Sequence, residues 1–390
     1  MAEQPHRHHY VPEWYQRRFL RDGATAFKIL DLHPDEYRHP KTGALRGRSK
    51  EILHKGPAAW FYEEDLYTTR FLGVENTEIE THLFGRIDRE GREGFDALVL
   101  EDWDKLHEYY DRFFEFLDAL RLRTPKGLLF LRKVSPARTQ YQLMMWMQQF
   151  RTMHCIMWAE GAREIFTVPS EVHTKLLFSD HPVTFYNRHV FPSDPNIPEN
   201  MDPQQQWQAT QTLVPLDHSH LAVFTHNEWG RAPVQKNARK PRTNARLFDN
   251  PMIRYDDWQR DRTLTEEQVH AVNYVIKTRA HRYVASTALE DLYPERHLKT
   301  RMWNKLLPFV MPKSYSVAPQ VGYTVVGFKD GTYYFQDEYG RRPATRAEHD
   351  QEVIKAKKMQ ENFEHILRKS GLTKKAEGSG DDPDSHSAGS

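Results

Sequence analysis

The chain of 390 residues carries 55 lysines and arginines against 54 aspartates and glutamates, so its net charge of +1 does not indicate a nucleic-acid-binding protein. Hydrophobic residues make up 38% and charged residues 28%, which is typical of a globular protein, and no apolar run is long enough to span a membrane. The single cysteine, Cys155, excludes an internal disulfide and a thiolate metal cluster. With no apolar secretory signal at the start, the sequence predicts a cytoplasmic protein without membrane association, and it leaves the oligomeric state open.

The first half of the chain predicts mainly helices. Apolar residues recur three and four positions apart in several segments, and Thr124-Pro125 ends the one over 102–122, because a residue before proline avoids the helical backbone region. The methionine-rich segment also carries tryptophan and phenylalanine on nearly every face, which favours a central buried helix over an adaptable binding groove. The expected elements are a short helix over 13–20, a strand over 26–32, a turn-rich segment over 33–48, and helices over 76–91, 102–122 and 136–166.

The second half predicts strands, followed by one well-marked helix. Thr265 and Gln268 form a capping box, which opens a helix that we expect to run to about Ser286. We expect strands over 176–187, 208–217 and 220–227, a hairpin of 323–328 and 332–335 around Lys329-Asp330-Gly331, a charged helix over 346–369 and a disordered tail over 370–390.

The order of these elements predicts an α+β fold. Its helical N-terminal half would pack against an antiparallel or mixed sheet from the second half, followed by a C-terminal hairpin and helix. We expect a single domain over 1–290, an extension over 291–369 and the tail.

Histidines concentrate at the start of the chain, in HRHHYVPEWYQRRF (6–19). In extended chain, His6 and His8 would share one side and His9 would face the other, so the segment predicts one wall of a polar pocket. An inward imidazole can act as a general base or a metal ligand, or it can anchor the segment by bonding a buried carbonyl. Further metal ligands would have to come from Asp180, His181 or the 217–220 cluster, none of which has the spacing of a known closed site, so a divalent metal stays an open alternative.

Arg123, at the end of the 102–122 helix, is a candidate for binding an anionic oxygen. A cation there also complements the helix dipole, which is the structural alternative. If Arg123 points inward it needs an acidic partner, because an unpaired buried charge is very costly. Asp180, which interrupts the apolar run LLFSDHPV, is the expected partner; it can equally cap a turn through bonds to backbone amides.

A basic segment, RAPVQKNARKPRTNAR (231–246), contains six lysines and arginines and no acidic residue. Its Arg242 and Arg246 are candidates for contacts with phosphates of a nucleic acid. The alternative is a solvated loop that charge repulsion and proline keep open.

The doubled histidine before a hydrophobic-proline step also resembles the first motif of histidine-asparagine-histidine nucleases, in which one histidine binds a divalent cation and another activates water. His33 and His39 are within range of such a motif. They lie in a proline-rich turn with no helix to carry the final ligand, so the analogy is weak.

Several motifs together resemble a bacterial family known as domain of unknown function 4238 (DUF4238). The resemblance covers roughly residues 8–290, departs from the family pattern at Trp14 and Gln16, and implies no activity, because none is assigned to the family. It rests on His9-Tyr10-Val11-Pro12 with the following aromatic residues to Phe19, the acidic-aromatic segment 60–67, Leu122-Arg123-Thr124-Pro125, Ser179-Asp180-His181-Pro182, Pro215-Leu216, Asn273 and the run 280–284.

The candidate residues fall on these motifs, and we expect them to meet in space. Asn273 lies on the apolar face of the late helix, where a buried amide must find hydrogen-bond partners. The expected catalytic set is His9, Asp180, Arg123 and Asn273, with His8, Tyr10, Arg242 and Arg246 binding substrate.

Two hypotheses follow. The first is a hydrolase resembling a nuclease or phosphodiesterase, with His9 or His8 as base or ligand, Asp180 orienting it and Arg123 binding an anionic oxygen. The second is a non-catalytic binding protein, such as a component of a bacterial defence or phage-defence system, whose polar residues are structural.

Overall fold

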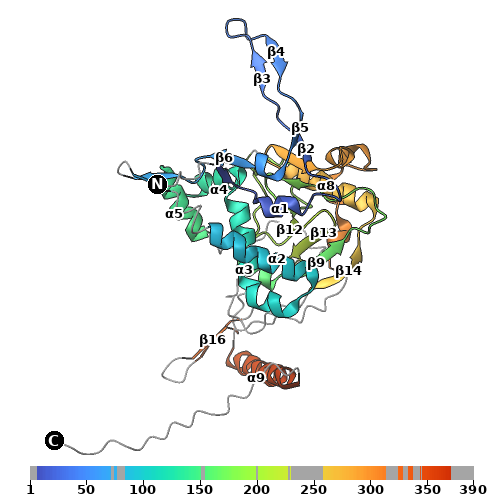
Figure 1. Ribbon diagram of the computed structural model, residues 1–390. Helices are drawn as coiled ribbons and strands as arrows, with labels where there is room; N and C mark the ends of the chain where they lie inside the picture. Colours follow the sequence, from blue (N-terminus) through green and yellow to red (C-terminus); the bar gives the residue numbers. More distant parts are fainter. Residues whose placement is uncertain are drawn as a thin grey trace, which may run out of the picture. The chain divides into compact units, whose positions relative to one another are not determined.

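The computed structural model describes residues 7–71, 74–76, 84–150, 154–198, 201–226, 229, 258–312, 324–327, 333–336, 343 and 345–369. The chain divides into two compact units, Met1–Pro319 and Gln320–Ser390. The first unit mixes helices with antiparallel and mixed sheets (Figure 1), which confirms the predicted α+β class.

Two long helices lie side by side in the first unit (Figure 1). α3 (Trp103–Leu122) matches the prediction closely, because the Asp102 side chain accepts the Lys105 backbone N–H and fixes its start. α2 (Gly85–Leu100) continues well past the predicted end at Gly91, and Glu101 ends it in the left-handed conformation (φ 60°). Gly91 serves packing instead, because it lets α2 approach Phe116 of α3 closely.

Thr124-Pro125 ends α3 as predicted, but it also begins α4 (Pro125–Val134), which the sequence analysis did not anticipate. The Thr124 hydroxyl accepts the Gly127 backbone N–H, and proline is favoured at the first helical position. The predicted helical block over 136–166 is shorter than expected, because its end forms a strand. It comprises α5 (Gln140–Phe150), α6 (Cys155–Glu160) and β9 (Ala162–Thr167).

A five-stranded sheet has the order β11-β12-β13-β9-β14. Its pairs are antiparallel except β14–β9, which is parallel. Every described residue of β11 and β12 is buried, as expected for strands at the centre of the fold. The remaining bounds are β11 (Thr184–Asn187), β12 (Thr210–Pro215), β13 (His220–Thr225) and β14 (Gln259–Thr263).

A four-stranded antiparallel sheet has the order β10-β15-β2-β5. The predicted capping box is present at the start of α8 (Glu266–Arg279), but this helix ends before Ser286, where the sequence predicted its end. The residues that follow form a strand instead, paired with β2 and β10. The strands are β2 (Phe27–Asp31), β5 (Ile52–Lys55), β10 (Phe178–Ser179) and β15 (Tyr283–Ser286).

Shorter elements complete the first unit. The segment after residue 290 contributes Trp303, Leu306, Leu307 and Val310 to a buried cluster around α8. The short helix α1 (Glu13–Arg17) lies where predicted. The two-stranded sheets are β1 (Arg7–His9) with β6 (Tyr62–Glu64), β3 (Glu36–Arg38) with β4 (Leu45–Arg48), and β7 (Thr69–Phe71) with β8 (Val74–Asn76); the 3-10 helices are η1 (Pro57–Ala59), η3 (Glu290–Leu292), η4 (Pro294–Arg296), η5 (Trp303–Lys305) and η6 (Pro308–Val310).

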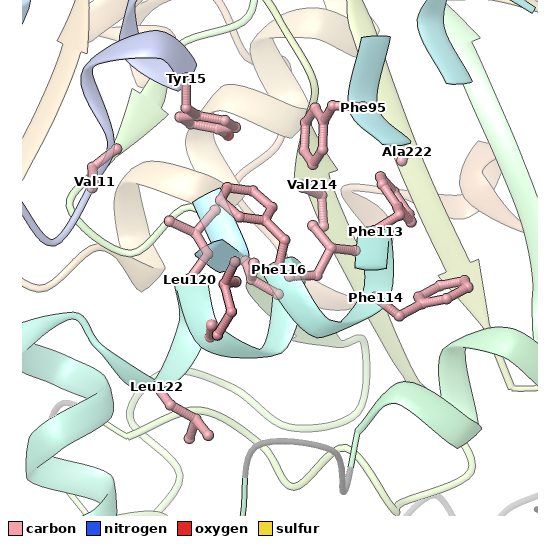
Figure 2. Close-up of a cluster of buried hydrophobic side chains, with 14 of the residues drawn as sticks. Val11, Tyr15, Phe95, Phe113, Phe114, Phe116, Leu120, Leu122, Val214 and Ala222 are labelled. Atoms are coloured by element: carbon pink, nitrogen blue, oxygen red, sulfur yellow. The ribbon is translucent and has the colours of Figure 1, made fainter. Parts of the chain in front are cut away.

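The main core surrounds α3, and Figure 2 shows its apolar side chains between α1, α2 and strands β12 and β13. Phe113, Phe114 and Phe116 of α3 are completely buried, as is Tyr15 of α1. Because both faces of α3 pack against other elements, the polar groups near its end are also taken out of water.

The second unit contains β16 (Thr324–Gly327) paired antiparallel with β17 (Tyr333–Gln336), and α9 (Arg346–Lys369). The predicted hairpin strands and charged helix are therefore confirmed, while the turn 329–331 and the tail 370–390 lie outside the described residues. Within the described part of the chain, no helix combines the length and apolarity that crossing a membrane requires.

The close contact of α2 and α3 can be tested by replacing Gly91 with alanine. The added Cβ would overlap the Cβ of Phe116, so we expect a loss of about 1–3 kcal/mol in the free energy of unfolding. Arg89→Ala, on an exposed position of the same helix, should change it by less than about 0.5 kcal/mol. The free energy of unfolding is measured by urea denaturation. A Gly91→Ala variant as stable as the parent would contradict the close contact of α2 and α3.

Candidate functional site

The first strand places alternate side chains on opposite sides. β1 pairs with β6, and Pro12 in extended conformation then turns the chain into α1. His8 is fully buried, and its Nδ1 accepts the Tyr67 backbone N–H at 2.9 Å. His9 faces the other way and lines a pocket, so the strand separates an anchoring imidazole from an accessible one.

The pocket lies between the β1–α1 segment and α2 and has a volume of about 600 Å3. Charged side chains of opposite sign stand four positions apart in the segments that line it. Glu13 lies 3.8 Å from His9 Nε2 and 3.3 Å from Arg17 Nη2, and Arg92 of α2 lies 3.6 Å from Asp96. The lining residues are His9, Pro12, Glu13, Trp14, Arg17, Arg18, Asp88 and Arg92.

Arg123 lies behind the Asp88 side of this pocket and is completely buried. Its Nη1 is 2.8 Å from Asp88 Oδ1, and its guanidinium lies over the rings of Phe84 and Phe116. The acidic partner that a buried Arg123 requires is therefore Asp88 of α2 rather than the expected Asp180. Nε and Nη2 of Arg123 have no hydrogen-bond partner among the described residues, so the guanidinium has further donors besides the one that faces Asp88.

The charge state of His9 follows from its surroundings. Burial lowers the pKa of His9 below 6.5, the Glu13 carboxylate raises it, and the Arg123 charge lowers it. Burial also raises the pKa of Asp88, which the Arg123 guanidinium opposes. At neutral pH His9 is therefore mainly a neutral imidazole that can accept a proton.

Arg123 is also tied to the first strand through Tyr67. The Tyr67 hydroxyl donates to the Arg123 carbonyl oxygen at 2.6 Å, while the Tyr67 backbone N–H donates to His8. His8 stacks on the Tyr67 ring with centroids 5.4 Å apart. His8 thus positions the end of α3 relative to β1, and its contacts are those of an anchor.

Tyr10 and Asp180 form a separate group. Burial raises the pKa of Tyr10 well above 10, and the nearby Asp180 charge adds to this effect. The Asp180 oxygens accept the backbone N–H groups of residues 281, 282 and 283 at 2.9, 2.7 and 2.9 Å. These bonds fix the turn between α8 and β15, the capping role that was the alternative for Asp180.

Asn273 bonds to a different segment. Its Oδ1 accepts the Leu177 backbone N–H at 3.1 Å, and its Nδ2 donates to the Lys175 carbonyl oxygen at 2.9 Å. The buried amide has found the partners it needs, all of them main-chain groups that lead into β10. Of the predicted site residues, His9 and Arg123 therefore lie near one another, and Tyr10 lies near Asp180. Asn273 belongs to neither pair. Arg242 and Arg246 lie outside the described residues.

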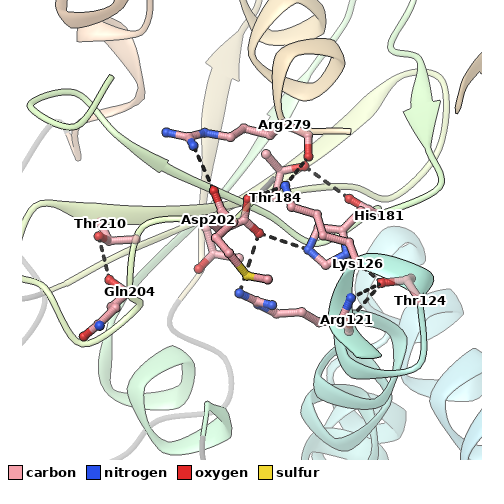
Figure 3. Close-up of polar contacts among 12 residues, drawn as sticks. Arg121, Thr124, Lys126, His181, Thr184, Asp202, Gln204, Thr210 and Arg279 are labelled. Carbon is pink, nitrogen blue, oxygen red and sulfur yellow. Dashed lines mark hydrogen bonds and ion pairs between the residues drawn. The ribbon is translucent and has the colours of Figure 1, made fainter. Parts of the chain in front are cut away.

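A second polar centre lies on the other side of the α3 end, around Asp202 (Figure 3). Its carboxylate is 2.7 Å from Lys126 Nζ, 3.0 Å from His181 Nε2 and 3.6 Å from Arg121 Nη2. All four side chains are buried. The three neighbours hold the pKa of Asp202 far below its usual range despite burial, so the carboxylate is ionised.

Thr124 and His181 extend this centre, with Thr124 Oγ1 2.7 Å from His181 Nδ1. Burial lowers the pKa of His181 to about 4, which makes the ring neutral at pH 7. The ionised Asp202 can only accept, so we assign the ring proton to Nε2, and Nδ1 then accepts the Thr124 hydroxyl proton. A hydroxyl, an imidazole and a carboxylate thus lie in sequence in a fully buried setting.

Sequence reasoning missed several of these residues. Asp88 stood in the predicted 76–91 helix, with Arg92 one helical turn further on and just past its predicted end, which was an available signal, whereas Asp202 lies in a segment without periodicity. Lys126 was overlooked because Thr124-Pro125 indicated only a helix end. His39, named for the nuclease analogy, accepts the backbone N–H groups of Lys41 and Thr42 in a hairpin turn. In the described ranges, no three His, Cys, Asp or Glu side chains are grouped so that they could hold a metal ion.

Comparisons with known proteins place this chain in a family. A family model described as "Protein of unknown function (DUF4238)" matches residues 7–288, a range that includes the pocket and the Asp202 centre. No curated protein and no solved structure matches the chain.

The neutral state of buried His181 predicts how stability depends on pH. The folded-state pKa of about 4 lies below the ordinary 6.5, so the unfolded chain takes up the proton first as pH falls. The contribution of the neutral His181 to the free energy of unfolding is fully present above pH 6.5. It is lost progressively as the pH falls from 6.5 to 4, by about 3 kcal/mol in total. Urea denaturation across this range should show His181→Gln with a correspondingly weaker pH dependence than the parent.

His54→Gln serves as the control, because His54 is exposed, and it should leave the pH dependence of the parent unchanged. A His181→Gln protein with the same pH dependence as the parent would show that His181 does not stay neutral in the folded state.

Proposed function

We propose a hydrolytic function for this chain, which belongs to the DUF4238 family of proteins of unknown function: it is a phosphodiesterase whose reaction takes place in the His9 pocket. The observation that carries the proposal is a neutral imidazole beside the Glu13 carboxylate, in a pocket that three arginines also line. A base next to anion-binding groups is what attack of water on a phosphodiester needs.

His9 is the proposed general base. Its Nε2 is beyond hydrogen-bond distance of Glu13, so it can take a proton from a water in the pocket while the carboxylate stabilises the imidazolium that forms. The depressed pKa keeps the base unprotonated at neutral pH. The water oxygen then bonds to phosphorus, the ester bond to the leaving oxygen breaks, and the imidazolium can return the proton to that oxygen.

The arginines are the proposed anion-binding groups. Arg17 and Arg92 are more than half exposed, and their pairs with the partly exposed Glu13 and Asp96 are worth little in water, so a phosphate can replace them. Their planar guanidinium groups suit two oxygens of a phosphate.

Arg123 contributes through Asp88 in this proposal. The pair holds a carboxylate at the pocket wall and places a positive charge close enough to lower the pKa of His9. Asp180 and Asn273 act at a distance, by fixing the backbone that supports β10 and β15. Arg242 and Arg246 remain proposed phosphate contacts.

A second function is favoured by one observation: Nδ1 of His8, the carboxylate of Asp180 and the amide of Asn273 all bond to backbone groups. Such bonds are what a structural polar set requires. In this alternative the chain is a non-catalytic binding protein, and the His9 pocket holds an anionic ligand without converting it.

The two functions are separated by one set of variants. We expect the parent to cleave bis(p-nitrophenyl) phosphate, or DNA or RNA, in the presence of magnesium, manganese or zinc. His9→Gln should lower kcat by about 100-fold or more, because it removes the base. Arg92→Gln should mainly raise KM, because it removes an anion contact.

Arg89→Gln is the matched control for Arg92→Gln, since it removes the same charge from an exposed position of α2 that does not line the pocket. The melting temperature of each variant shows whether it remains folded. A parent that cleaves none of these substrates, or a folded His9→Gln variant with the parent's kcat, would refute the catalytic proposal; ligand binding without cleavage would favour the second function.

A further inference from the structure

We infer that the hairpin of β3 and β4 is an arm that binds duplex DNA. The inference rests on the proposed phosphodiesterase function and names the class of its substrate. Figure 1 shows the hairpin projecting from the strands β2 and β5 that precede and follow it. All residues of β3 are exposed, and β4 has only Gly47 half-buried, so the hairpin contributes no side chains to the core.

Stability of the fold does not explain this hairpin. A two-stranded ribbon without a packed face is marginal in water, so local bonds must maintain it. Its turn is held by His39, whose Nδ1 accepts the backbone N–H groups of Lys41 and Thr42 at 3.2 and 3.3 Å. Gly43 follows with φ 70°, a conformation that glycine adopts without strain.

One face of the ribbon is basic. The register pairs Glu36 with Arg48, so Arg48 shares the face of Glu36, and Arg38 lies two residues beyond Glu36 on β3. The register shifts between Tyr37 and Arg38, which leaves Arg46 as the unpaired residue of a β-bulge. Glu36 is 2.8 Å from Arg48 Nη2 and 2.5 Å from Arg38 Nη2, so a single carboxylate orients two guanidinium groups across the strands. These two arginines lower the pKa of Glu36, which stays ionised.

Positive charge on the arm exceeds what its own acids can neutralise. Lys41 at the turn and Arg46 of β4 are exposed and have no ion-pair partner in the described parts of the chain. Of the two acidic residues, Asp35 also pairs with Arg282, 3.0 Å away in the body of the unit. The basic residues of this segment are Arg38, Lys41, Arg46, Arg48 and Lys50, and its acidic residues are Asp35 and Glu36.

The opposite face carries Tyr37, which is 58% exposed, while Leu45, which is 49% exposed, pairs across the strands with Arg38. Tyr37 pairs with Gly47, which leaves its ring uncovered by a cross-strand side chain. Exposed apolar groups beside clustered arginines suit the edges of bases and sugars next to phosphates.

A two-stranded ribbon fits the major groove of duplex DNA, whereas the major groove of duplex RNA is too deep and narrow for side chains to read. We therefore assign the basic face to phosphates and the Tyr37 face to the groove. Binding is measured by fluorescence anisotropy of a labelled 20-base-pair DNA at several salt concentrations.

Lys41→Gln with Arg46→Gln removes the two unpaired cations. We expect its affinity for the duplex to fall at least about tenfold at 0.1 M salt, and the slope of log K against log salt to decrease in magnitude by about 1.8. Tyr37→Ala should also weaken binding while leaving the salt slope unchanged. Arg132→Gln with Lys133→Gln, an equal charge change at exposed positions of α4, should stay within twofold of the parent.

A parent that does not bind the duplex, or a hairpin variant that binds as tightly as the parent, would overturn the inference. Its failure is distinguishable from that of the proposed function. Cleavage of bis(p-nitrophenyl) phosphate without duplex binding would refute only the DNA-binding role of the hairpin. Duplex binding that depends on Lys41 and Arg46, without any cleavage, would refute only the phosphodiesterase function.

Discussion

The buried ion pair of Arg123 and Asp88 is the interaction on which the arrangement of the first unit depends. It joins the end of α3 to the first turn of α2, and the same arginine accepts a bond from Tyr67, which in turn holds His8 of β1. Removing one partner of a buried pair leaves an uncompensated charge, which costs about 3–5 kcal/mol. Three segments distant in the chain are thereby fixed around the pocket that His9 lines.

The end of α3 carries two arginines that point to different centres. Arg123 pairs with Asp88 at the pocket, and Arg121, two residues earlier, lies over the Phe185 ring and near Asp202. Thr124 then caps α4 and contacts His181. One short motif, Arg121 to Lys126, therefore organises a partly open charged pocket and a closed buried one, and only the open one can admit a substrate.

Local chemistry explains what could be predicted from the sequence. The stripe of α3, the capping box of α8 and the C-terminal hairpin depend on residues close together in the chain, and each was found. The end of α8 was misplaced because Asp180, far upstream, binds the amides of residues 281–283 and turns the chain into β15. For the same reason the partner of Arg123 was not identified: Asp88 lies on a different helix, and the pattern within one helix does not show which residue of another it meets.

Titration of the His9 imidazole by NMR tests most directly whether the buried Arg123 charge lies close enough to act on the pocket that His9 lines. The account predicts a pKa below 6.5 in the parent, because burial and the Arg123 charge both disfavour the imidazolium. In a folded Arg123→Met variant this pKa should rise, since one of the causes that lower it is removed. A pKa at or above 6.5 in the parent, or one that does not respond to the loss of Arg123, would contradict the central claim.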